Sequence, residues 1–273
     1  MSSINGLALS LIDDAAVFPP GNAPLADAVT LYYNRFETNQ QEVVGPLLVP
    51  ASAVETLRTL ADPGRMLDIA IIADTGLEGL VAARDALEHD TWITVQHVEL
   101  RVPPNGTLSE SVHNLLDSLV FTVPTYVELP IPDAPSGLAV LADDGAERAK
   151  FRTGPYDVPS PEQLAAAIGA AVRLHVPFKL TGGLHHALPT HDEASDRQHH
   201  GLLNVLAATA AATKGADDFT LAGILGSRDP DRLLAQLGIV DAGAIRRHFK
   251  SLGSCSVDEP YRELVRYGVV KES

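Results

Sequence analysis

Short apolar runs recur along the chain, and each is followed by a polar turn and then by a signal for the start of a helix. Apolar runs without strict alternation are typical of strands that are buried on both faces, as in a parallel sheet covered by helices. The runs predict eight strands, at residues 11–18, 43–50, 67–74, 92–102, 125–131, 147–152, 176–181 and 219–225.

Helix-start signals separate these strands. In a capping box, a Ser or Thr side chain accepts a hydrogen bond from a free backbone N–H, and a Glu or Gln three residues later reaches back. Such signals occur at Ser52 with Glu55, Thr75 with Glu78, Thr107 with Glu110, Ser160 with Gln163, and Asp229 with Pro230. This alternation over 273 residues favours a closed (β/α)8 barrel, the TIM barrel, as one domain over residues 1–273. An open doubly wound sheet is the alternative.

Composition narrows the choice of partners. The chain has 35 acidic and 20 basic side chains, a net charge of -15, so nucleic acid and anionic membranes are poor partners. It has no N-terminal signal segment, no apolar run long enough to span a bilayer, and a single cysteine, Cys255, which we interpret as structural. These features predict a cytoplasmic protein that acts on a small molecule, and they leave open whether it forms a homo-oligomer.

Polar side chains close most of the expected strands. In a barrel, the carboxyl ends of the strands carry the active-site groups, so we expect these side chains to converge at one end. Alternate residues of a strand share a face, so Lys150 points with Arg152, and Lys179 points with Thr181. The full set is Asp13, Asp14, Asp74, His97, Glu99, Arg101, Glu128, Lys150, Arg152, Lys179 and Thr181.

The run V-P-F-K-L-T places Lys179 inside an apolar strand. Burial of an unpaired ammonium group costs several kcal/mol, so the amine is paired, neutralised or used. One interpretation is a buried structural ion pair. The other is chemical: two neighbouring lysines lower the pKa of one of them, which leaves an amine able to attack a carbonyl group and form a Schiff base.

The two lysine segments, A-K-F-R-T-G and F-K-L-T-G-G-L-H, resemble the paired lysine motifs of class I aldolases of the deoxyribose-phosphate aldolase type. The resemblance covers about 40 of the 273 residues. It implies that Lys150 is the nucleophile, that Lys179 tunes it, and that Gly182 and Gly183 approach an anionic group. Arg152 departs from the pattern, where a small polar residue is expected, and two histidines follow the glycines. Protons would be moved by Glu99, Glu128 or an acidic residue of the first strand. In that strand, Asp13 or Asp14 could serve as the base or pair with one of the two lysines.

Five of the ten histidines lie within residues 185–200. Three of them, His185, His186 and His200, could hold a divalent metal ion with Asp192 or Glu193, although the spacing matches no zinc motif. A second interpretation is a lid over the barrel mouth in which His185 or His186 shuttles protons, and a third is a plain polar loop. His200 and Asn204 share a helix face and would sit at the mouth.

The last expected strand ends in G-I-L-G-S-R. Loops after the last barrel strands often bind phosphate through backbone N–H groups. The candidates here are Gly223, Gly226, Ser227 and Arg228, with an ordinary turn as the alternative.

Three functions remain open. The first is an aldolase-like lyase that forms an imine with a small carbonyl substrate and needs no cofactor. The second is a metal-dependent hydrolase or isomerase that uses the histidine loop. The third is a non-catalytic barrel that binds an anionic small molecule.

Overall fold

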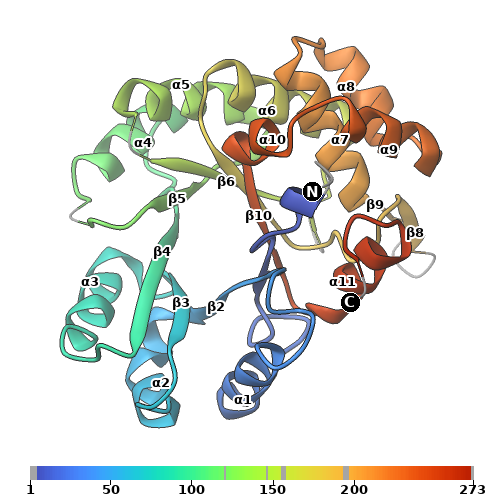
Figure 1. Cartoon of the computed structure of the whole chain (residues 1–273). Helices are drawn as coiled ribbons and strands as arrows, with labels where there is room; N and C mark the ends of the chain where they lie inside the picture. The colour runs from blue at the N-terminus through green and yellow to red at the C-terminus, as the bar shows by residue number, and fades with distance from the viewer. Residues whose placement is uncertain (1–4, 120, 146, 155–157, 193–196, 272–273) are drawn as a thin grey trace.

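A closed barrel of eight parallel strands forms the centre of the protein (Figure 1). The computed structural model describes residues 5–119, 121–145, 147–154, 158–192 and 197–271. Hydrogen-bonded neighbours follow the order β1-β10-β7-β6-β5-β4-β3-β2, and β1 closes the ring against β2. The prediction of a (β/α)8 barrel is confirmed, and the open doubly wound alternative is wrong.

The barrel strands are β1 (Ile12–Asp14), β2 (Val44–Pro50), β3 (Leu67–Ile72), β4 (Ile93–Arg101), β5 (Thr125–Glu128), β6 (Arg148–Arg152), β7 (Phe178–Thr181) and β10 (Phe249–Ser254). A separate antiparallel pair, β8 (Thr190–Asp192) and β9 (Arg197–His199), lies in the loop after β7.

Helices surround the barrel, as Figure 1 shows. They are α1 (Leu25–Arg35), α2 (Val54–Leu60), α3 (Gly76–Ala86), α4 (Leu108–Leu116), α5 (Ala134–Asp144), α6 (Pro161–Arg173), α7 (Leu202–Thr213), α8 (Asp218–Leu225), α9 (Pro230–Gly238), α10 (Ala242–His248) and α11 (Asp258–Arg266). Short 3-10 helices lie at Asn5–Leu7, Ala51–Ala53 and Ile131–Asp133.

The prediction of the eighth strand at 219–225 is wrong, because this run forms helix α8. Asp217 caps the helix by accepting from the N–H of Thr220 at 2.8 Å. Leu221, Ile224 and Leu225 are buried at helical spacing, whereas Phe219 is exposed to solvent. The eighth strand is F-K-S-L-G-S at 249–254, which carries few strongly apolar residues.

The predicted capping boxes have different outcomes. Both hydrogen bonds form at Thr107 with Glu110 and at Ser160 with Gln163, and Asp229 caps α9. The other two predictions are wrong. Ser52 lies in a 3-10 helix and hydrogen bonds to Asp74 instead, and Thr75 precedes α3 without capping it.

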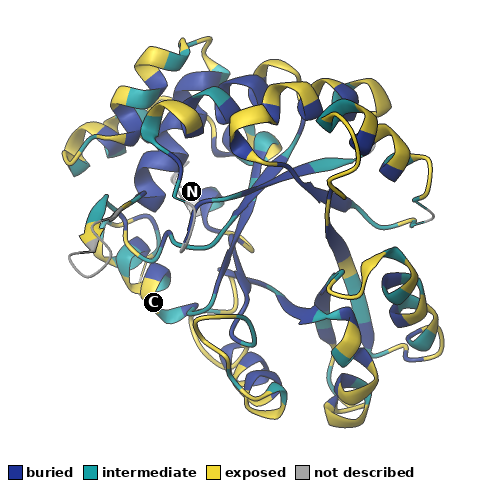
Figure 2. Cartoon of the chain, turned by 180° about the vertical axis from the view of Figure 1, so that it is seen from behind, coloured by how far each residue is buried: buried dark blue, intermediate teal, exposed yellow. Residues whose placement is uncertain are grey.

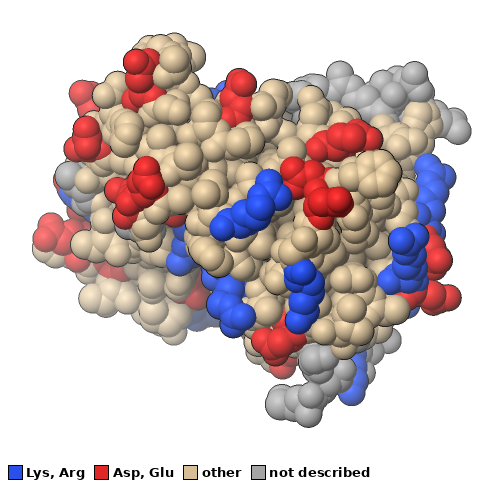
Figure 3. All heavy atoms as spheres, turned by 90° about the horizontal axis from the view of Figure 1, so that it is seen from above, with Lys and Arg blue, Asp and Glu red and all other residues tan. Residues whose placement is uncertain are grey.

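Apolar residues fill the space between barrel and helices, while exposed residues lie on the outer helix faces (Figure 2). Inside the barrel, a small apolar cluster of Ala15, Leu48 and Ala70 is covered by Phe18 and Ile72. On the face shown in Figure 3, basic side chains are interspersed with acidic ones. Among the described residues, no helix is both long and apolar enough to cross a membrane.

Candidate active site

A cavity of about 1000 Å³ opens at the carboxyl ends of the barrel strands. Glu99, Lys150 and Arg152 line it from β4 and β6, Thr181 lines it from the end of β7, and the loop after β7 lines it with residues 182–186. A smaller cavity of about 540 Å³ lies beside it and shares Arg152. The fold therefore directs the strand-end residues into a space that can hold a small molecule.

Lys179 lies inside the barrel with no exposed surface. Its Nζ contacts carboxylate oxygens of both Asp13 and Glu99 and lies 3.3 Å from Nε2 of His97. The Tyr126 ring lies beside the ammonium group, with its centroid 5.4 Å from Nζ. The apolar strand can hold this charge because two carboxylates from other strands compensate for the lost water.

The electrostatics of Lys179 differ from the expectation that it could be the lysine with the lowered pKa. Burial alone would lower the pKa of the amine, but the carboxylates of Asp13 and Glu99 raise it above its ordinary value. Lys179 is therefore a stable ammonium ion. Burial, together with the Lys179 charge, lowers the pKa of His97, so this ring is neutral at pH 7.

Lys150 is the neighbour of Lys179 in the sheet and reaches the cavity floor. Its Nζ lies 2.7 Å from Oε2 of Glu99 and 2.8 Å from Oε2 of Glu128. Glu99 therefore contacts both lysines, one with each oxygen. The predicted convergence of Glu99, Glu128, Lys150 and Lys179 at one end of the barrel is confirmed.

Two arginines surround Glu128. Arg101 donates to its Oε1 at 2.8 Å, and Arg152 donates to both of its oxygens at 3.2 Å. Burial would raise the pKa of Glu128, but Lys150 and Arg152 lower it to about 2. Lys150 and Lys179 likewise hold the pKa of Glu99 well below its usual range, against the effect of burial. Both carboxyl groups are ionised at neutral pH.

Asp14 lies apart from the lysines. Its side chain points to the other side of β1, where it pairs with Arg35 at 2.5 Å. Burial raises its pKa although Arg35 acts in the opposite direction. The acidic residue of β1 that faces the lysines is Asp13, and Ser251 of β10 donates to it at 2.7 Å.

The glycines that follow the two lysine strands bring their loops together. Gly182 and Gly183 have positive φ values of 76° and 83°, and a Cβ on Gly182 would overlap the carbonyl oxygen of Gly154. Thr153 also donates from Oγ1 to the Gly182 carbonyl at 2.5 Å. These glycines are therefore needed for close packing at the cavity rim, whatever they bind.

The histidines of the loop have separate partners. His185 lies at 2.7 Å from Glu259, and the Nε2 of buried His200 donates to the Pro159 carbonyl at 2.8 Å. All five described histidines of the loop line the cavity: His185, His186, His191, His199 and His200. The expectation that His200 lies at the mouth is therefore confirmed. Glu193 lies outside the described residues. The structure thus gives His185 and His200 partners other than a shared metal ion.

Asn204 and the residues after α8 do not reach the main cavity. Asn204 is buried in α7 and donates to the carbonyl oxygens of Ile224 and Ser227 at 2.8 and 2.7 Å. Gly226 ends α8 and lines a different cavity, of about 440 Å³, with His200. Because α8 is not the last strand, the prediction that Gly226 and Ser227 follow that strand is wrong.

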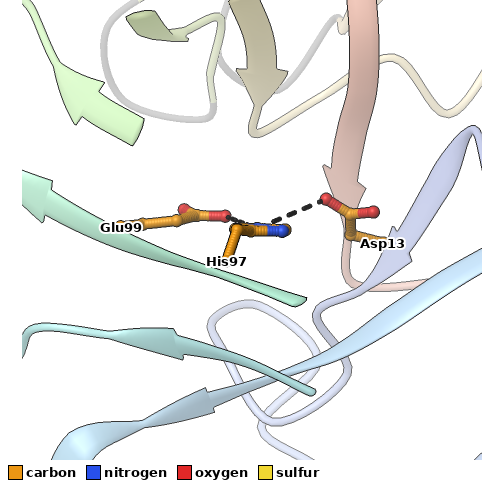
Figure 4. A group of neighbouring side chains, drawn as sticks. All are labelled: Asp13, His97 and Glu99. Carbon is orange, nitrogen blue, oxygen red and sulfur yellow. Dashed lines mark hydrogen bonds and ion pairs between the residues drawn. The ribbon is translucent and has the colours of Figure 1, made fainter. Parts of the chain in front are cut away.

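Within the described residues, one group of acidic and histidine side chains meets closely enough to hold a metal ion: Asp13, His97 and Glu99 (Figure 4). Figure 4 shows the three pointing toward one another inside the barrel. Lys179 Nζ already contacts all three. A metal ion would have to displace this ammonium group, so the donor set fits the lysine better.

The expectation that Asp13 or Asp14 pairs with one of the two lysines is confirmed for Asp13, whereas sequence reasoning missed Ser251 and gave His97 no role in this network. Ser251 was missed because the eighth strand was placed elsewhere. The run F-K-S-L-G-S lacks the period-2 alternation of apolar residues that marks a strand, so the sequence offered no clear signal for it.

Neither the models of known protein families nor the curated proteins include a match to this chain. TIM barrels are commonly enzymes with sites at this end of the barrel, but the fold specifies no reaction. The function therefore has to be argued from the side chains in the cavity.

Proposed function

We propose that the protein is an aldolase-like lyase that forms a Schiff base with a small carbonyl compound. The observation that carries this proposal is the position of Lys150, whose amine lies on the floor of a cavity of about 1000 Å³ between two carboxylates. Lys179 is fully buried below it and does not line the cavity. Lys150 is the nucleophile because it is the one of the two that a substrate can reach.

The reaction begins when deprotonated Lys150 Nζ adds to the carbonyl carbon. Loss of water gives an iminium ion, which accepts the electron pair of a neighbouring carbon–carbon bond as that bond breaks, leaving an enamine. The enamine carbon then takes a proton, and water hydrolyses the new iminium ion, which releases the second product and restores the free Lys150 amine. Glu99 and Glu128 stabilise the cationic nitrogen, and one of them accepts the proton of the hydroxyl group that becomes the new carbonyl.

Lys150 acts beside two carboxylates, so the position of Glu99 decides where charge lies next to the reacting nitrogen. Lys179 holds the second oxygen of Glu99 and places a positive charge beside Lys150 in the sheet. Lys179 is thus a positioning residue for Glu99 and not a nucleophile.

The cavity lining favours a substrate with an anionic substituent, such as a carboxylate or phosphate group. Arg152 lines the cavity, and its side chain is 40% exposed, so it can contact a ligand beyond its pairing with Glu128. His186 and His199 add polar donors opposite the apolar side chains of Phe18 and Ile72.

Reduction with borohydride tests the proposal. The protein is incubated with a panel of aldehydes and ketones, with and without anionic groups, and then reduced and digested for peptide mass spectrometry. We expect one stable adduct, on the peptide that contains Lys150. Lys150→Met should abolish it, whereas Lys214→Met, a change at an exposed lysine after α7, should leave it intact.

An adduct on a lysine other than Lys150 would identify that lysine as the nucleophile instead. If the protein turns over a carbonyl compound and no lysine is ever modified, the Schiff-base mechanism is wrong.

A further inference from the structure

Cys255, His185 and Glu259 meet at the wall of the same cavity. Nε2 of His185 lies 3.8 Å from Sγ of Cys255, and its Nδ1 lies 2.7 Å from Oε2 of Glu259. All three side chains line the cavity. A nucleophile next to a base whose other nitrogen faces an acidic side chain is the arrangement used in covalent catalysis by serine and cysteine enzymes.

The three residues come from neighbouring parts of the barrel rim. Cys255 directly follows β10, Glu259 lies in the first turn of α11, and His185 lies in the loop after β7. Strands β7 and β10 are hydrogen-bonded neighbours, so their loops emerge side by side at the active-site end. Cys255 therefore has a histidine neighbour in space, which its local sequence does not show.

The surroundings of the Cys255 sulfur favour the protonated thiol, which must lose its proton to a base as it attacks a substrate. Burial raises the pKa of Cys255 and the Glu259 charge adds to this, although the backbone N–H groups of Cys255 and Gly21 act in the opposite direction. The resting group is a thiol, so the proton must pass to His185 during attack. Gly21 can approach this closely because it has no side chain, and a Cβ there would lie 3.2 Å from Cβ of Cys255.

We propose that Cys255, His185 and Glu259 form a thiol acyl-transfer site that accepts an ester or thioester of a small acid. Sγ attacks the acyl carbon while His185 takes the thiol proton. The bond to the leaving alcohol or thiol then breaks, and that group takes the proton from His185. Water attacks the resulting acyl-cysteine in the same way, which releases the acid and restores the thiol.

The Glu259 carboxylate lies within ion-pair distance of Nδ1 and stabilises the positive charge of the imidazole ring during the transfer. Its side chain is about half exposed and that of His185 is one-quarter exposed, so the pair stays in contact with solvent that can supply the hydrolytic water. This activity is separate from the imine chemistry, since it uses none of the lysines.

The chain has one cysteine, so chemical labelling of a thiol is unambiguous. The intact protein is treated with p-nitrophenyl acetate, release of p-nitrophenol is followed, and the acetylated peptide is mapped by mass spectrometry. We expect a burst of one equivalent and an acetyl group on Cys255. In the Cys255→Ser variant, the burst and the acetylated peptide should both be absent.

The variants separate an activated thiol from one that is only accessible. His185→Ala should slow acetylation of Cys255 by about a hundredfold at neutral pH, and Glu259→Gln should slow it less. His113→Ala, at an exposed position on α4, is the matched control and should react at the wild-type rate. Unfolding midpoints of the variants establish that they are folded.

Alkylation by iodoacetamide decides the remaining cases. If iodoacetamide modifies Cys255 but p-nitrophenyl acetate does not, the thiol is accessible and the acyl-transfer proposal is overturned. It is equally overturned if His185→Ala acetylates at the wild-type rate, or if neither reagent reaches the sulfur. None of these outcomes bears on borohydride trapping at Lys150.

Discussion

Lys179 shows how a single charge can organise the interior of a barrel. Its ammonium group neutralises Asp13 and Glu99, which come from strands on either side of the barrel interior, and it also contacts His97. Removing one partner of a buried ion pair leaves an uncompensated charge, whereas the intact network costs little. Lys179 is therefore important for the stability of the fold, although it does not line the cavity.

Replacement of Lys179 by Met should lower the free energy of unfolding by about 3–5 kcal/mol, because two carboxylates are left buried without their shared cation. Urea unfolding at pH 7 measures the change. Lys214→Met is the control and should shift the free energy by less than about 0.5 kcal/mol. Equal shifts for the two variants would contradict the ion network.

Glu128 predicts a pH dependence of stability. Its pKa falls from the ordinary value of 4.5 to about 2 in the folded protein. A carboxyl group with a depressed folded pKa stabilises the protein above its unfolded pKa, and this contribution is lost as the pH falls from about 4.5 to about 2. Unfolding free energies of wild type and Glu128→Gln across this window should converge as the pH falls. A constant difference would show that the pKa is not shifted.

Positions of individual residues were predicted unevenly from the sequence. Lys150, Lys179, Glu99 and Glu128 converge as expected, since alternate residues of parallel strands must point into the barrel. The choice between Asp13 and Asp14 depended on the register of β1, where a shift of one residue exchanges the two faces. The contact of His185 with Cys255 joins residues 70 positions apart and has no signal in the sequence.

At the level of elements, the loops after β6 and β7 form one packed unit. Gly182 carries a positive φ of 76° and touches the Gly154 backbone, whereas Gly215, with a φ of 84°, has open space around the position of a Cβ. An alanine at either position would have to adopt the unfavourable positive φ. Only at position 182 would its Cβ also overlap atoms of the Gly154 backbone.

Gly182→Ala should therefore destabilise the protein by more than Gly215→Ala does. Positive φ costs each variant on the order of 1 kcal/mol, and the overlap with Gly154 adds about 1–3 kcal/mol at Gly182 alone. Paired urea unfolding curves measure the difference. If the two variants lose the same free energy, the close packing of the loops is not what requires glycine at 182.

The elements also show why one strand was misplaced. The run 219–225 is short and apolar, and such a run is compatible with either a buried strand or a helix. The N-cap Asp217 and the burial of residues at helical spacing stabilise the helix instead of a strand. The true strand at 249–254 has only two large apolar residues, so its β structure depends on pairing with β1 and β7, which the sequence does not display.

At the scale of the whole molecule, the net charge of -15 destabilises the compact state through repulsion between acidic side chains. Raising NaCl from about 10 to 150 mM shortens the screening length from about 30 to 8 Å. We expect the melting temperature to rise by a few degrees, which corresponds to about 1 kcal/mol for a domain of this size. Differential scanning calorimetry at the two salt concentrations measures it, and a lower melting temperature at 150 mM would mean that attractive ion pairs dominate.

Because β1 pairs with β10, the barrel can close only after residues 249–254 have been synthesised. Asp13 is synthesised early, but its partner Lys179 follows 166 residues later and Ser251 follows 238 residues later. The ring of strands closes only when residues 249–254 join residues 12–14. During translation, β1 stays unpaired on one edge until residues 249–254 have left the ribosome, and a chain that ends before them lacks part of the cavity wall.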